Sequence, residues 1–561
     1  MNRFLTILSA VIFSAGLFAQ GVIPKHVVFL KNKDNNPYSL SNPSAFLTQR
    51  AIDRRTRYGI SFDTKDLPVT PSYVEQISGA GAQVFYSLKW FNAVVIATDN
   101  PVVLADIAAL PFVDHIDQVL KKNPTHTGEN SGTKQSEAIP PFTLNNPVPS
   151  ATPKSATVFN YGQAYNQVHM IKVDLLHDLG FAGEGMIIAI LDAGFSNANI
   201  VSAFDSLWLN NRILGTRDFN QPGNNVCADS MHYHGTMVLS TMGANLPGQI
   251  VGTAPHASFW LVRTEVAWYE ALIEEYNWAG GAEFADSLGV DVINSSLGYT
   301  EFDNPAFNHT YADMDGNTTP ITRAADLAAS LGMIVVSSAG NEGGSAWQYI
   351  SAPADGDSVF TIGAVDPSGS YAYFSSTGPT YDGRIKPDVV AQGENATVVS
   401  PGGNVIQGSG TSFSSPIMAG AMACLWQSAQ TSSAQDLRNA VRSTASQAST
   451  PDFLLGYGIP NMMNARTVLA VISNSSATQN TFSLFPVPFS TSPRLQYNLK
   501  GSEKVKIEIL SITGQIICSF MPDIHGSSTF RLDAFTSLPS GLYFVRINST
   551  IGQQVIRAVK L

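Results

Sequence analysis

Four side chains of types that carry out nucleophilic catalysis follow one another along the sequence: Asp192, His234, Asn341 and Ser412. A serine hydroxyl is a weak nucleophile at neutral pH, and it reacts when a nearby base such as histidine takes its proton. A carboxylate can fix the tautomer of that histidine, and a side-chain amide can donate a hydrogen bond to the oxyanion that forms. The set therefore predicts Ser412 as nucleophile, His234 as base and Asp192 as the group that orients the base. Asn341 would then help to bind the oxyanion.

Each of these residues also has an ordinary structural explanation when it is considered alone. Asp192 and Ser412 could be turn or helix-cap residues, and Asn341 could occupy a left-handed turn. His234 could be a buried structural histidine, and His232 competes with it for the role of base but lacks the Gly-Thr sequence that follows His234. The order Asp, His, Asn, Ser carries more weight than any one residue, and it excludes the Ser, Asp, His order of the α/β-hydrolases.

The sequence around these residues predicts elements that could bring them together. Apolar strand patterns alternate with helical patterns through residues 161–472, which predicts a parallel sheet with helices on both faces. Asp192 then lies at the carboxyl end of a buried strand, where such sheets bind ligands. Ser412 lies at or just inside the start of a helix, where backbone amides favour negative charge, and Pro416 occupies the first turn of that helix. The predicted strands include residues 186–191, 259–262, 290–294 and 333–337, and the predicted helices include residues 278–288, 321–331 and 417–427.

The chain of 561 residues is long enough for several domains, and its composition changes along its length. Residues 20–120 combine strand and helix patterns in a small α/β unit. Residues 121–160 are rich in Pro, Thr, Ser, Asn and Gly and predict a linker. After a second linker at residues 473–482, residues 483–561 show strand patterns separated by Gly and Pro turns, which predicts a small β-sandwich.

Composition and charge exclude several classes of function. With 44% hydrophobic residues the chain can form a sizeable core, and its formal net charge of -11 argues against nucleic acid or an anionic membrane surface as a partner. Residues 1–19 carry a basic start and a short apolar run, which predicts a secretory signal. No later stretch is long and apolar enough for a transmembrane segment. Cys227, Cys424 and Cys518 are too few for a disulfide framework, so buried free thiols are expected, with a Cys227–Cys424 pair as the alternative.

Seven short stretches occur in an informative order. They are Ile-Leu-Asp-Ala-Gly at 190–194, His-Gly-Thr at 234–236, Val-Ile-Asn-Ser-Ser-Leu-Gly at 292–298, Ser-Ala-Gly-Asn-Glu at 338–342, Phe-Ser-Ser-Thr-Gly-Pro at 374–379, Ile-Lys-Pro-Asp at 385–388 and Gly-Thr-Ser at 410–412. Through them the chain resembles the subtilisin-like serine peptidases, the subtilase or S8 family, over about residues 160–470. The resemblance implies an α/β fold with a seven-stranded parallel sheet and helices on both faces.

By this resemblance Asp192, His234 and Ser412 are the catalytic triad of an endopeptidase that works through an acyl-enzyme intermediate, and no cofactor is required. Asn341 and the backbone amide of Ser412 are the oxyanion hole. The resemblance also implies a cleft in which a peptide pairs as an extended strand. The residues that it assigns to this cleft are Ser296, Leu297, Gly298, Ala339 and Gly340. One departure is Met237, where the family usually has a second histidine, and it concerns local packing rather than catalysis.

The flanking regions resemble parts of exported subtilases. Residues 20–120 look like a subtilase propeptide, a ferredoxin-like α+β inhibitor and folding aid that is removed before residue 161. Residues 483–561 resemble the sorting domain of proteins exported by the type IX secretion system of certain Gram-negative bacteria, with Leu-Phe-Pro-Val-Pro-Phe at 484–489 and Leu-Pro-Ser-Gly-Leu-Tyr-Phe-Val-Arg at 538–546. A general β-sandwich accessory domain is the alternative. The implied partners are peptide or protein substrates, the chain's own propeptide and the secretion machinery, and the implied location is secreted or on the cell surface.

Two further interpretations stay open at the level of sequence. A catalytically inactive subtilase-fold protein could bind or adhere at the cell surface, although the presence of all four candidate residues favours the peptidase; a lipase or esterase is a third candidate. Asp313, Asp315 and Asn317 place oxygen ligands at alternate positions, as a structural calcium loop does. Because the loop lacks a distant bidentate glutamate, an ordinary acidic turn is the favoured interpretation.

Overall fold

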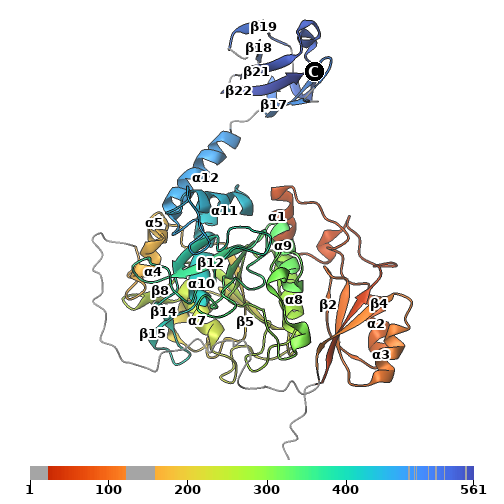
Figure 1. Ribbon diagram of the computed structural model, residues 1–561, viewed down its shortest axis with the longest axis vertical. Helices are drawn as coiled ribbons and strands as arrows, with labels where there is room; N and C mark the ends of the chain where they lie inside the picture. Colours follow the sequence, from red (N-terminus) through yellow and green to blue (C-terminus); the bar gives the residue numbers. More distant parts are fainter. Residues whose placement is uncertain are drawn as a thin grey trace, which may run out of the picture. The chain divides into compact units, whose positions relative to one another are not determined.

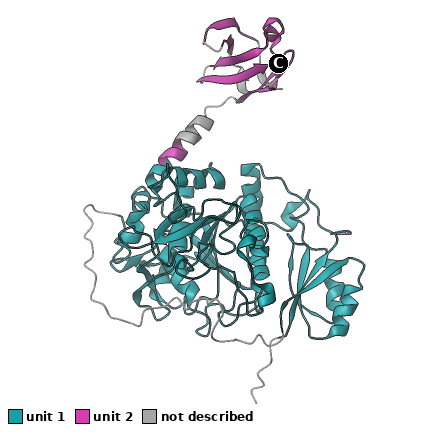
Figure 2. Ribbon diagram, viewed as in Figure 1, with its two compact units in different colours: residues 1–466 teal, residues 467–561 magenta. Residues whose placement is uncertain are grey.

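The computed structural model describes residues 23–121, 158–477 and 481–561, apart from positions 486, 488, 503–504, 512–513, 523–524 and 550–551. Within it the chain divides into two compact units, residues 1–466 and residues 467–561 (Figure 2). The predicted signal at residues 1–19 and most of the predicted linker at 121–160 lie outside the described residues. No helix of the described part is long and apolar enough to cross a membrane.

A seven-stranded sheet in which neighbouring strands are parallel forms the centre of the first unit, and it confirms the predicted fold class. Most of its strands are buried runs of apolar residues, as expected for a sheet that is covered on both faces. In the order in which they pair, the strands are β13 (Val389–Gln392), β12 (Phe360–Val365), β11 (Ile334–Ser338), β10 (Val292–Ser295), β5 (Ile187–Asp192), β9 (Ser258–Arg263) and β6 (Ile213–Asp218).

Helices cover both faces of this sheet (Figure 1). On one face α10 (Thr411–Ser428) packs on the strands from β5 to β13 and on α7 (His234–Gly243). On the other face α8 (Ile273–Leu288) packs against α9 (Pro320–Ser330). Smaller helices of this unit are α4 (Tyr165–Met170), α5 (Val173–Asp178), α6 (Asp205–Leu209) and α11 (Ala434–Ser443), and α12 (Met462–Ala477) runs from the first unit into the second.

Helix α10 begins at Thr411, as expected for a serine at or just inside a helix start, but Pro416 lies inside the helix rather than in its first turn. Sequence rules favour a helix that starts at or after a proline, because proline lacks the N–H that would bond to the carbonyl four residues earlier. That carbonyl belongs to Ser412, and here it accepts a hydrogen bond from the Ser296 hydroxyl at 3.0 Å. A side chain from another element therefore replaces the missing backbone donor, which local sequence does not reveal.

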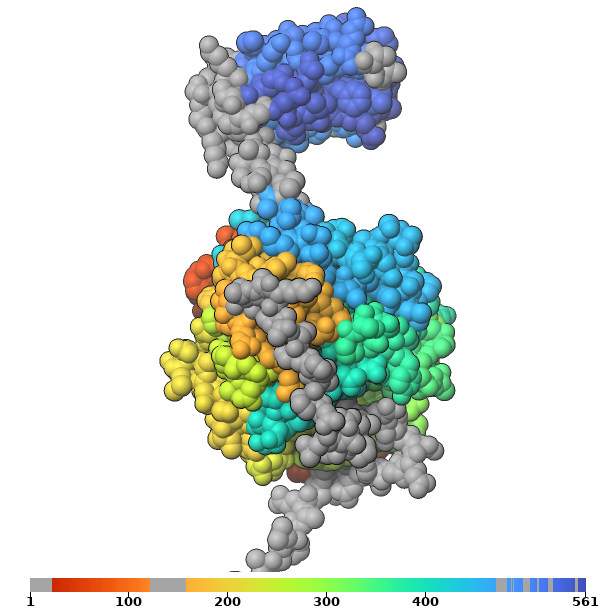
Figure 3. All heavy atoms as spheres, turned by 90° about the vertical axis from the view of Figure 1, so that its left-hand side faces the viewer, coloured from red at the N-terminus to blue at the C-terminus, as the bar shows by residue number. Residues whose placement is uncertain are grey.

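The start of the predicted 161–472 domain is packed onto the hairpin formed by β14 (Ala396–Val399) and β15 (Val405–Gly408). Gln167 in α4 donates to the Thr397 carbonyl at 3.1 Å and accepts from the Thr397 amide at 2.7 Å. In the space-filling view the orange surface of the α4 and α5 region lies next to the teal surface of this hairpin (Figure 3). The side-chain amide of Gln167 thus bonds the hairpin as a paired strand would.

Residues 23–121 form a four-stranded antiparallel sheet of order β2-β3-β1-β4 with two of their three α-helices on one face, the predicted ferredoxin-like arrangement. One face, which includes Val28 and Ile96, is buried beneath these helices. The opposite face, which includes Val27 and Val95, joins the apolar cluster of α8. The elements are β1 (Lys25–Leu30), α1 (Gln49–Tyr58), α2 (Pro71–Gly79), β2 (Gln83–Leu88), β3 (Ala93–Ala97), α3 (Pro101–Ala108) and β4 (Val113–Leu120).

The second unit contains two antiparallel sheets around one apolar cluster, as the predicted β-sandwich requires. Its first sheet is β16 (Thr481–Phe485), β17 (Arg494–Ser502) and β20 (His525–Arg531), and its second is β19 (Ile516–Phe520), β18 (Lys506–Leu510), β21 (Gly541–Ser549) and β22 (Gly552–Lys560). The expected linker at 473–482 differs from the structure, because α12 continues to Ala477 and β16 begins at Thr481. The Ser- and Asn-rich composition that suggested a linker is thus compatible with the end of a helix.

All three cysteines are free. Cys227 and Cys424 are buried, and burial raises the pKa of the Cys227 thiol to about 11. Cys518 is half-buried in the second unit rather than fully buried. The expected free thiols are therefore present, and the alternative Cys227–Cys424 pair is not formed.

Replacing Ile190 by alanine is expected to destabilise the first unit by about 2–5 kcal/mol, because the side chain is fully buried in central strand β5 and its removal leaves a cavity. Ile200 is 70% exposed, so Ile200→Ala should change stability by less than about 0.5 kcal/mol. Urea unfolding followed by tryptophan fluorescence measures both variants. Equal midpoints for the two variants would contradict the assignment of β5 to the core.

Candidate active site

Asp192 and His234 form a buried pair at the carboxyl edge of the sheet. Asp192 is the last residue of β5 and His234 is the first of α7. The His234 Nδ1 atom lies 2.9 Å from each carboxylate oxygen of Asp192, which is fully buried. A carboxylate can only accept, so the Nδ1 atom carries the shared proton, and Nε2 is the ring nitrogen left to accept another.

The two residues after His234 fix its position, and they explain why His234 rather than His232 meets Asp192. The Gly235 amide donates to the Gly194 carbonyl at 3.0 Å, and a Cβ atom on Gly235 would lie only 2.4 Å from that oxygen. The Thr236 hydroxyl donates to the Ser196 carbonyl at 2.7 Å. The first turn of α7 is therefore held against the turn after β5, and this close approach requires glycine.

Arg263 is a site residue that sequence reasoning missed. It ends β9, directly beside Asp192 in the register, and it is 4% exposed. Its Nε atom donates to the Ala193 carbonyl at 3.0 Å, and its Nη1 atom pairs with Asp218 at 2.9 Å. It thus ties the turn after Asp192 to the end of β6. A buried arginine at the end of an otherwise apolar strand was the available signal.

Ser412 is the second residue of α10, so its N–H belongs to the first helical turn, where amides lack helical partners. It is 6% exposed, and its hydroxyl donates to the Ser296 carbonyl at 3.4 Å. Helices α7 and α10 pack together, and the ring of Phe413 lies 6.4 Å from the ring of His234, centroid to centroid. The starts of the two helices that carry Ser412 and His234 are thus neighbours.

A chain of buried polar side chains connects α10 to β10 behind Ser412. The Ser415 hydroxyl donates to Asn294 Oδ1 at 3.0 Å, and Asn294 Nδ2 donates to the Ser296 hydroxyl at 3.0 Å. Asn294 is fully buried, and the Ser296 hydroxyl in turn donates to the Ser412 carbonyl. These bonds fix how deep α10 lies above the sheet. Sequence analysis assigned Ser296 to the substrate cleft and did not identify Asn294 as part of the site.

Asn341 lies three residues beyond the end of β11 and faces the start of α10. Its Oδ1 atom accepts from the Thr411 amide at 2.8 Å and from the Thr411 hydroxyl at 2.9 Å. Both bonds use the carbonyl end of the side chain, so the NH₂ end is directed away from Thr411 and can donate elsewhere. Gly340 adds a contact of its own, from its amide to the Thr411 hydroxyl at 3.2 Å.

The two predicted cleft segments, residues 296–298 and 339–340, follow the neighbouring parallel strands β10 and β11 at the same sheet edge. They meet around Ser351. A Cβ atom on Gly298 would lie 2.1 Å from the Ser351 hydroxyl, and one on Gly340 would lie 3.1 Å from it. Ser351 is 4% exposed, and its hydroxyl has no hydrogen-bond partner among the described residues. Sequence reasoning missed Ser351 because it lies ten or more residues from either segment.

The carboxylates of the predicted calcium loop are used by their own turns. Asp313 accepts from the amide and hydroxyl of Thr310, at 2.6 and 2.8 Å. Asp315 accepts from the amides of Asn317 and Thr318, at 2.8 and 2.9 Å. Burial tends to raise the pKa of Asp315, but these hydrogen bonds outweigh it and lower the pKa. In the described part of the chain no three His, Cys, Asp or Glu side chains gather as metal ligands would.

Comparison with known proteins gives three family matches. A model of the subtilase family matches residues 183–458, one of the Peptidase S8 propeptide domain of Bacteroidota matches residues 25–136, and one of the secretion system C-terminal sorting domain matches residues 483–560. Subtilisin DY of Bacillus licheniformis is 30% identical over 53% of this chain and 96% of its own length. Subtilisin E of Bacillus subtilis (strain 168) is 30% identical over 53% of this chain and 70% of its own length. Among solved structures, MycP1 with its N-terminal propeptide removed covers 54% of this chain and 96% of its own, at 21% identity and a TM-score of 0.42.

Gly235→Ala is expected to separate His234 from Asp192. The added methyl would lie 2.4 Å from the Gly194 carbonyl oxygen, so the start of α7 must move away from the turn after β5. The downfield proton resonance of the hydrogen-bonded His234 Nδ1 should then shift or disappear in proton NMR spectra. In the control Gly402→Ala the methyl meets no atom closer than 3.5 Å, and the resonance should not change. An unchanged resonance in both variants would show that this close approach does not position His234.

Proposed function

The chain belongs to the subtilase family, and from this membership we propose a secreted serine endopeptidase in which Ser412 attacks the peptide bond, His234 takes the serine proton and Asp192 orients His234. The observation that carries the proposal is the double 2.9 Å contact between His234 Nδ1 and the buried Asp192 carboxylate. Because that carboxylate holds the Nδ1 proton, Nε2 is the nitrogen that can act as base.

The reaction proceeds through a covalent intermediate. Ser412 Oγ attacks the carbonyl carbon of the substrate while His234 Nε2 takes its proton, and the resulting imidazolium is stabilised by Asp192. His234 then gives that proton to the leaving amine, and an acyl-enzyme remains. A water molecule, activated by the same histidine, attacks the acyl group and releases the second product.

The oxyanion of each tetrahedral intermediate is bound by the Ser412 amide and by the side chain of Asn341. Two hydrogen bonds from Thr411 hold the carbonyl end of the Asn341 side chain, which supports a role for its NH₂ end as the donor. Donors that are held in place before the reaction need no reorganisation when the charge forms. The substrate lies as an extended strand between residues 296–298 and 339–340, as their places after two adjacent parallel strands favour.

Catalysis by these groups uses no cofactor. A structural calcium ion at Asp313, Asp315 and Asn317 stays the weaker prediction, because both carboxylates already accept hydrogen bonds from their own turns. The loop then acts as an acidic turn before α9.

The two flanking regions are proposed to control maturation and export of the peptidase. The S8 propeptide match at residues 25–136 supports the role of residues 20–120 as an inhibitor and folding aid that is removed on maturation. The sorting-domain match at residues 483–560 implies export from a Bacteroidota cell, and we assign to this domain the contact with the type IX secretion machinery. The mature product is released or attached at the cell surface.

Ser412→Ala should abolish both labelling by a fluorophosphonate probe and cleavage of casein by the matured protein. Loss of the serine or of His234 is expected to lower kcat by about 10⁶-fold, the magnitude known for subtilisin. Asn341→Ala should lower kcat by about 10²–10³-fold and leave fluorophosphonate labelling detectable, because the nucleophile and base remain.

The same experiment separates the peptidase from its alternatives. Ser414 lies on the same helix and is fully buried, so Ser414→Ala serves as a control that should keep labelling. A wild-type protein that does not label would favour the inactive surface-binding protein. Rapid ester hydrolysis without casein cleavage would favour a lipase or esterase.

Deletion of residues 483–561 should leave the protein inside the cell of a Bacteroidota host, while a full-length Ser412→Ala variant should still be exported. Immunoblots of culture medium, cell surface and periplasm measure the distribution. The sorting assignment fails if the truncated chain reaches the medium as efficiently as the full-length chain.

A further inference from the structure

The domain formed by residues 23–121 contacts the rest of its unit through two surfaces, which Lys89 connects. The first is the open face of its sheet, which packs on α8. There the Glu283 carboxylate accepts from the Lys89 amide at 2.7 Å and from the Trp90 amide at 2.9 Å. The second surface is α1, an additional helix inserted between β1 and α2 of the ferredoxin-like arrangement.

Helix α1 lies at the amino-terminal edge of the seven-stranded sheet. Arg50 donates to the carbonyls of Gly289 and Gly185, both at 2.9 Å, and pairs with Asp291 at 2.5 Å. Gly289 and Asp291 come directly before β10, and Gly185 comes directly before β5. The next arginine on this side of the helix, Arg54, donates to the Val290 carbonyl, also before β10.

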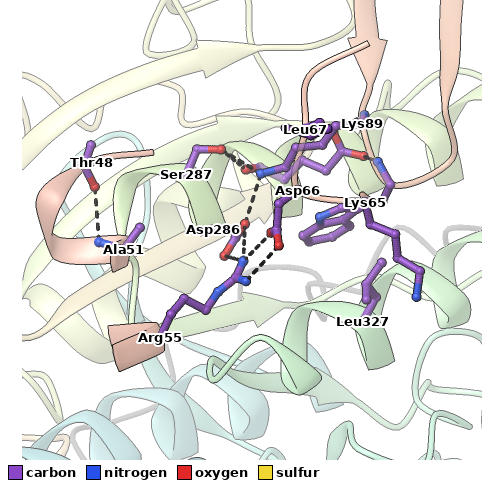
Figure 4. Close-up of polar contacts among 12 residues, drawn as sticks. Thr48, Ala51, Arg55, Lys65, Asp66, Leu67, Lys89, Asp286, Ser287 and Leu327 are labelled. Atoms are coloured by element: carbon purple, nitrogen blue, oxygen red, sulfur yellow. Dashed lines mark hydrogen bonds and ion pairs between the residues drawn. The ribbon is translucent and has the colours of Figure 1, made fainter. Parts of the chain in front are cut away.

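A buried charge network joins α1 to α8. The Asp286 carboxylate is fully buried and pairs with Arg54 at 2.6 Å, with Arg55 at 3.0 Å and with Lys89 at 3.0 Å. Arg55 is fully buried as well, and it also pairs with Asp66 at 2.9 Å. Figure 4 shows the Arg55 guanidinium between the carboxylates of Asp66 and Asp286. All three cations come from residues 23–121, whereas Asp286 belongs to α8.

The last turn of α1 reaches the far end of the helix that begins with the candidate nucleophile. The Tyr58 hydroxyl donates to the Gln430 carbonyl at 3.2 Å and accepts from Trp426 Nε1 at 3.1 Å. Trp426 is near the end of α10, and Ser412 is at its start. A strand of six residues such as β5 is about 20 Å long, so α1 and the candidate catalytic residues lie at opposite edges of the sheet.

We propose that α1 is a clamp, a second attachment at the sheet edge opposite the candidate catalytic residues, and that its buried ion pairs set how long the 23–121 domain stays bound once the chain between the two domains is cut. This proposal rests on the proposed role of residues 20–120 as a removable propeptide. Release then requires the Asp286 network to break. When α1 leaves, it uncovers a surface with Asp286, Asp291 and outward-facing carbonyls. This surface fits an arginine-rich helix but not a helix without charged side chains.

Neither mild acid nor moderate salt is expected to open the clamp. Burial alone would raise the pKa of Asp286, but Lys89, Arg54 and Arg55 outweigh it and lower the pKa to about 2. A carboxylate with a lowered pKa contributes its stability above its unfolded value of 3.8 and loses it only as the pH falls toward 2. The pairs are buried, so salt screens them weakly.

The test uses the full chain with Ser412→Ala, to prevent self-cleavage, and a protease recognition sequence inserted within residues 122–157. After this site is cut, size-exclusion chromatography and dilution measure how fast the 23–121 fragment leaves. The parent should keep the fragment at pH 7 and at pH 5. Arg54→Ala combined with Arg55→Ala should release it about 100-fold faster or more, because the buried Asp286 carboxylate then loses two of its three cationic partners.

Two further variants decide the outcome if the double variant does not fold. Arg57→Ala, at an exposed position of the same helix, should release the fragment within about twofold of the parent rate. Arg55→Lys keeps the charge but cannot span both carboxylates, and it should release the fragment about tenfold faster. The clamp is wrong if the parent loses the fragment as soon as the linker is cut, or if Arg55→Lys matches Arg57→Ala. Retention is measured as binding, whereas the role of Ser412 is tested by fluorophosphonate labelling, so a failure of the clamp and a failure of the proposed nucleophile are distinguishable.

Discussion

The hydrogen-bonded pair of Asp192 and His234 is the constraint on which the rest of the site depends. A fully buried carboxylate is costly unless it is bonded, and Asp192 satisfies that need through both oxygens with His234 and through the Ala193 amide. This arrangement works only if the end of β5 and the start of α7 approach closely, which Gly235 permits and Thr236 secures. The packing of α10 on α7 and the polar chain through Asn294 then set the place of Ser412 relative to that pair. The chemistry is thus fixed by three elements whose contacts are all made at one edge of the sheet.

Because all strands of the parallel sheet run in one direction, its two edges differ, and in this protein they carry different contacts. Its carboxyl edge collects Asp192, the segment after β10 and the segment after β11, because parallel strands all end there. Its amino-terminal edge exposes the carbonyls and Asp291 that precede β10 and β5, and α1 binds these. A helix that binds one edge leaves the other edge to the candidate active site. The contacts of α1 can therefore be altered at a distance from the candidate catalytic groups, since the described contacts of α1 are made at the amino-terminal edge and along α8.

Much of the site could be predicted from sequence because its residues carry local signals. Asp192 follows a buried strand, and His234 has the Gly-Thr that its close approach requires. The sheet and the sandwich followed from strand patterns. Arg263 and Asn294 could not be found in this way, since each bonds to a partner distant in the sequence, and Ser351 is identified only by its closeness to Gly298 and Gly340. Pro416 shows the same limit: the local rule places proline in the first turn of a helix, and the Ser296 hydroxyl, by donating to the Ser412 carbonyl, allows the helix to begin earlier.

The α1 contact is made by buried charges rather than by apolar packing, and this difference has a physical consequence. A buried ion pair adds little net stability, because desolvation of both partners opposes their attraction, yet removal of one partner is strongly destabilising. Such a contact therefore adds little net binding energy but is highly selective. Asp286 has its full set of ion pairs only when Arg54, Arg55 and Lys89 bind together in the right geometry. An apolar surface of similar size would tolerate many partners and would remain exposed after the domain has left. Asp286 can be hydrated once it is uncovered, so the ionic contact combines selectivity in the bound state with a surface that tolerates water after release.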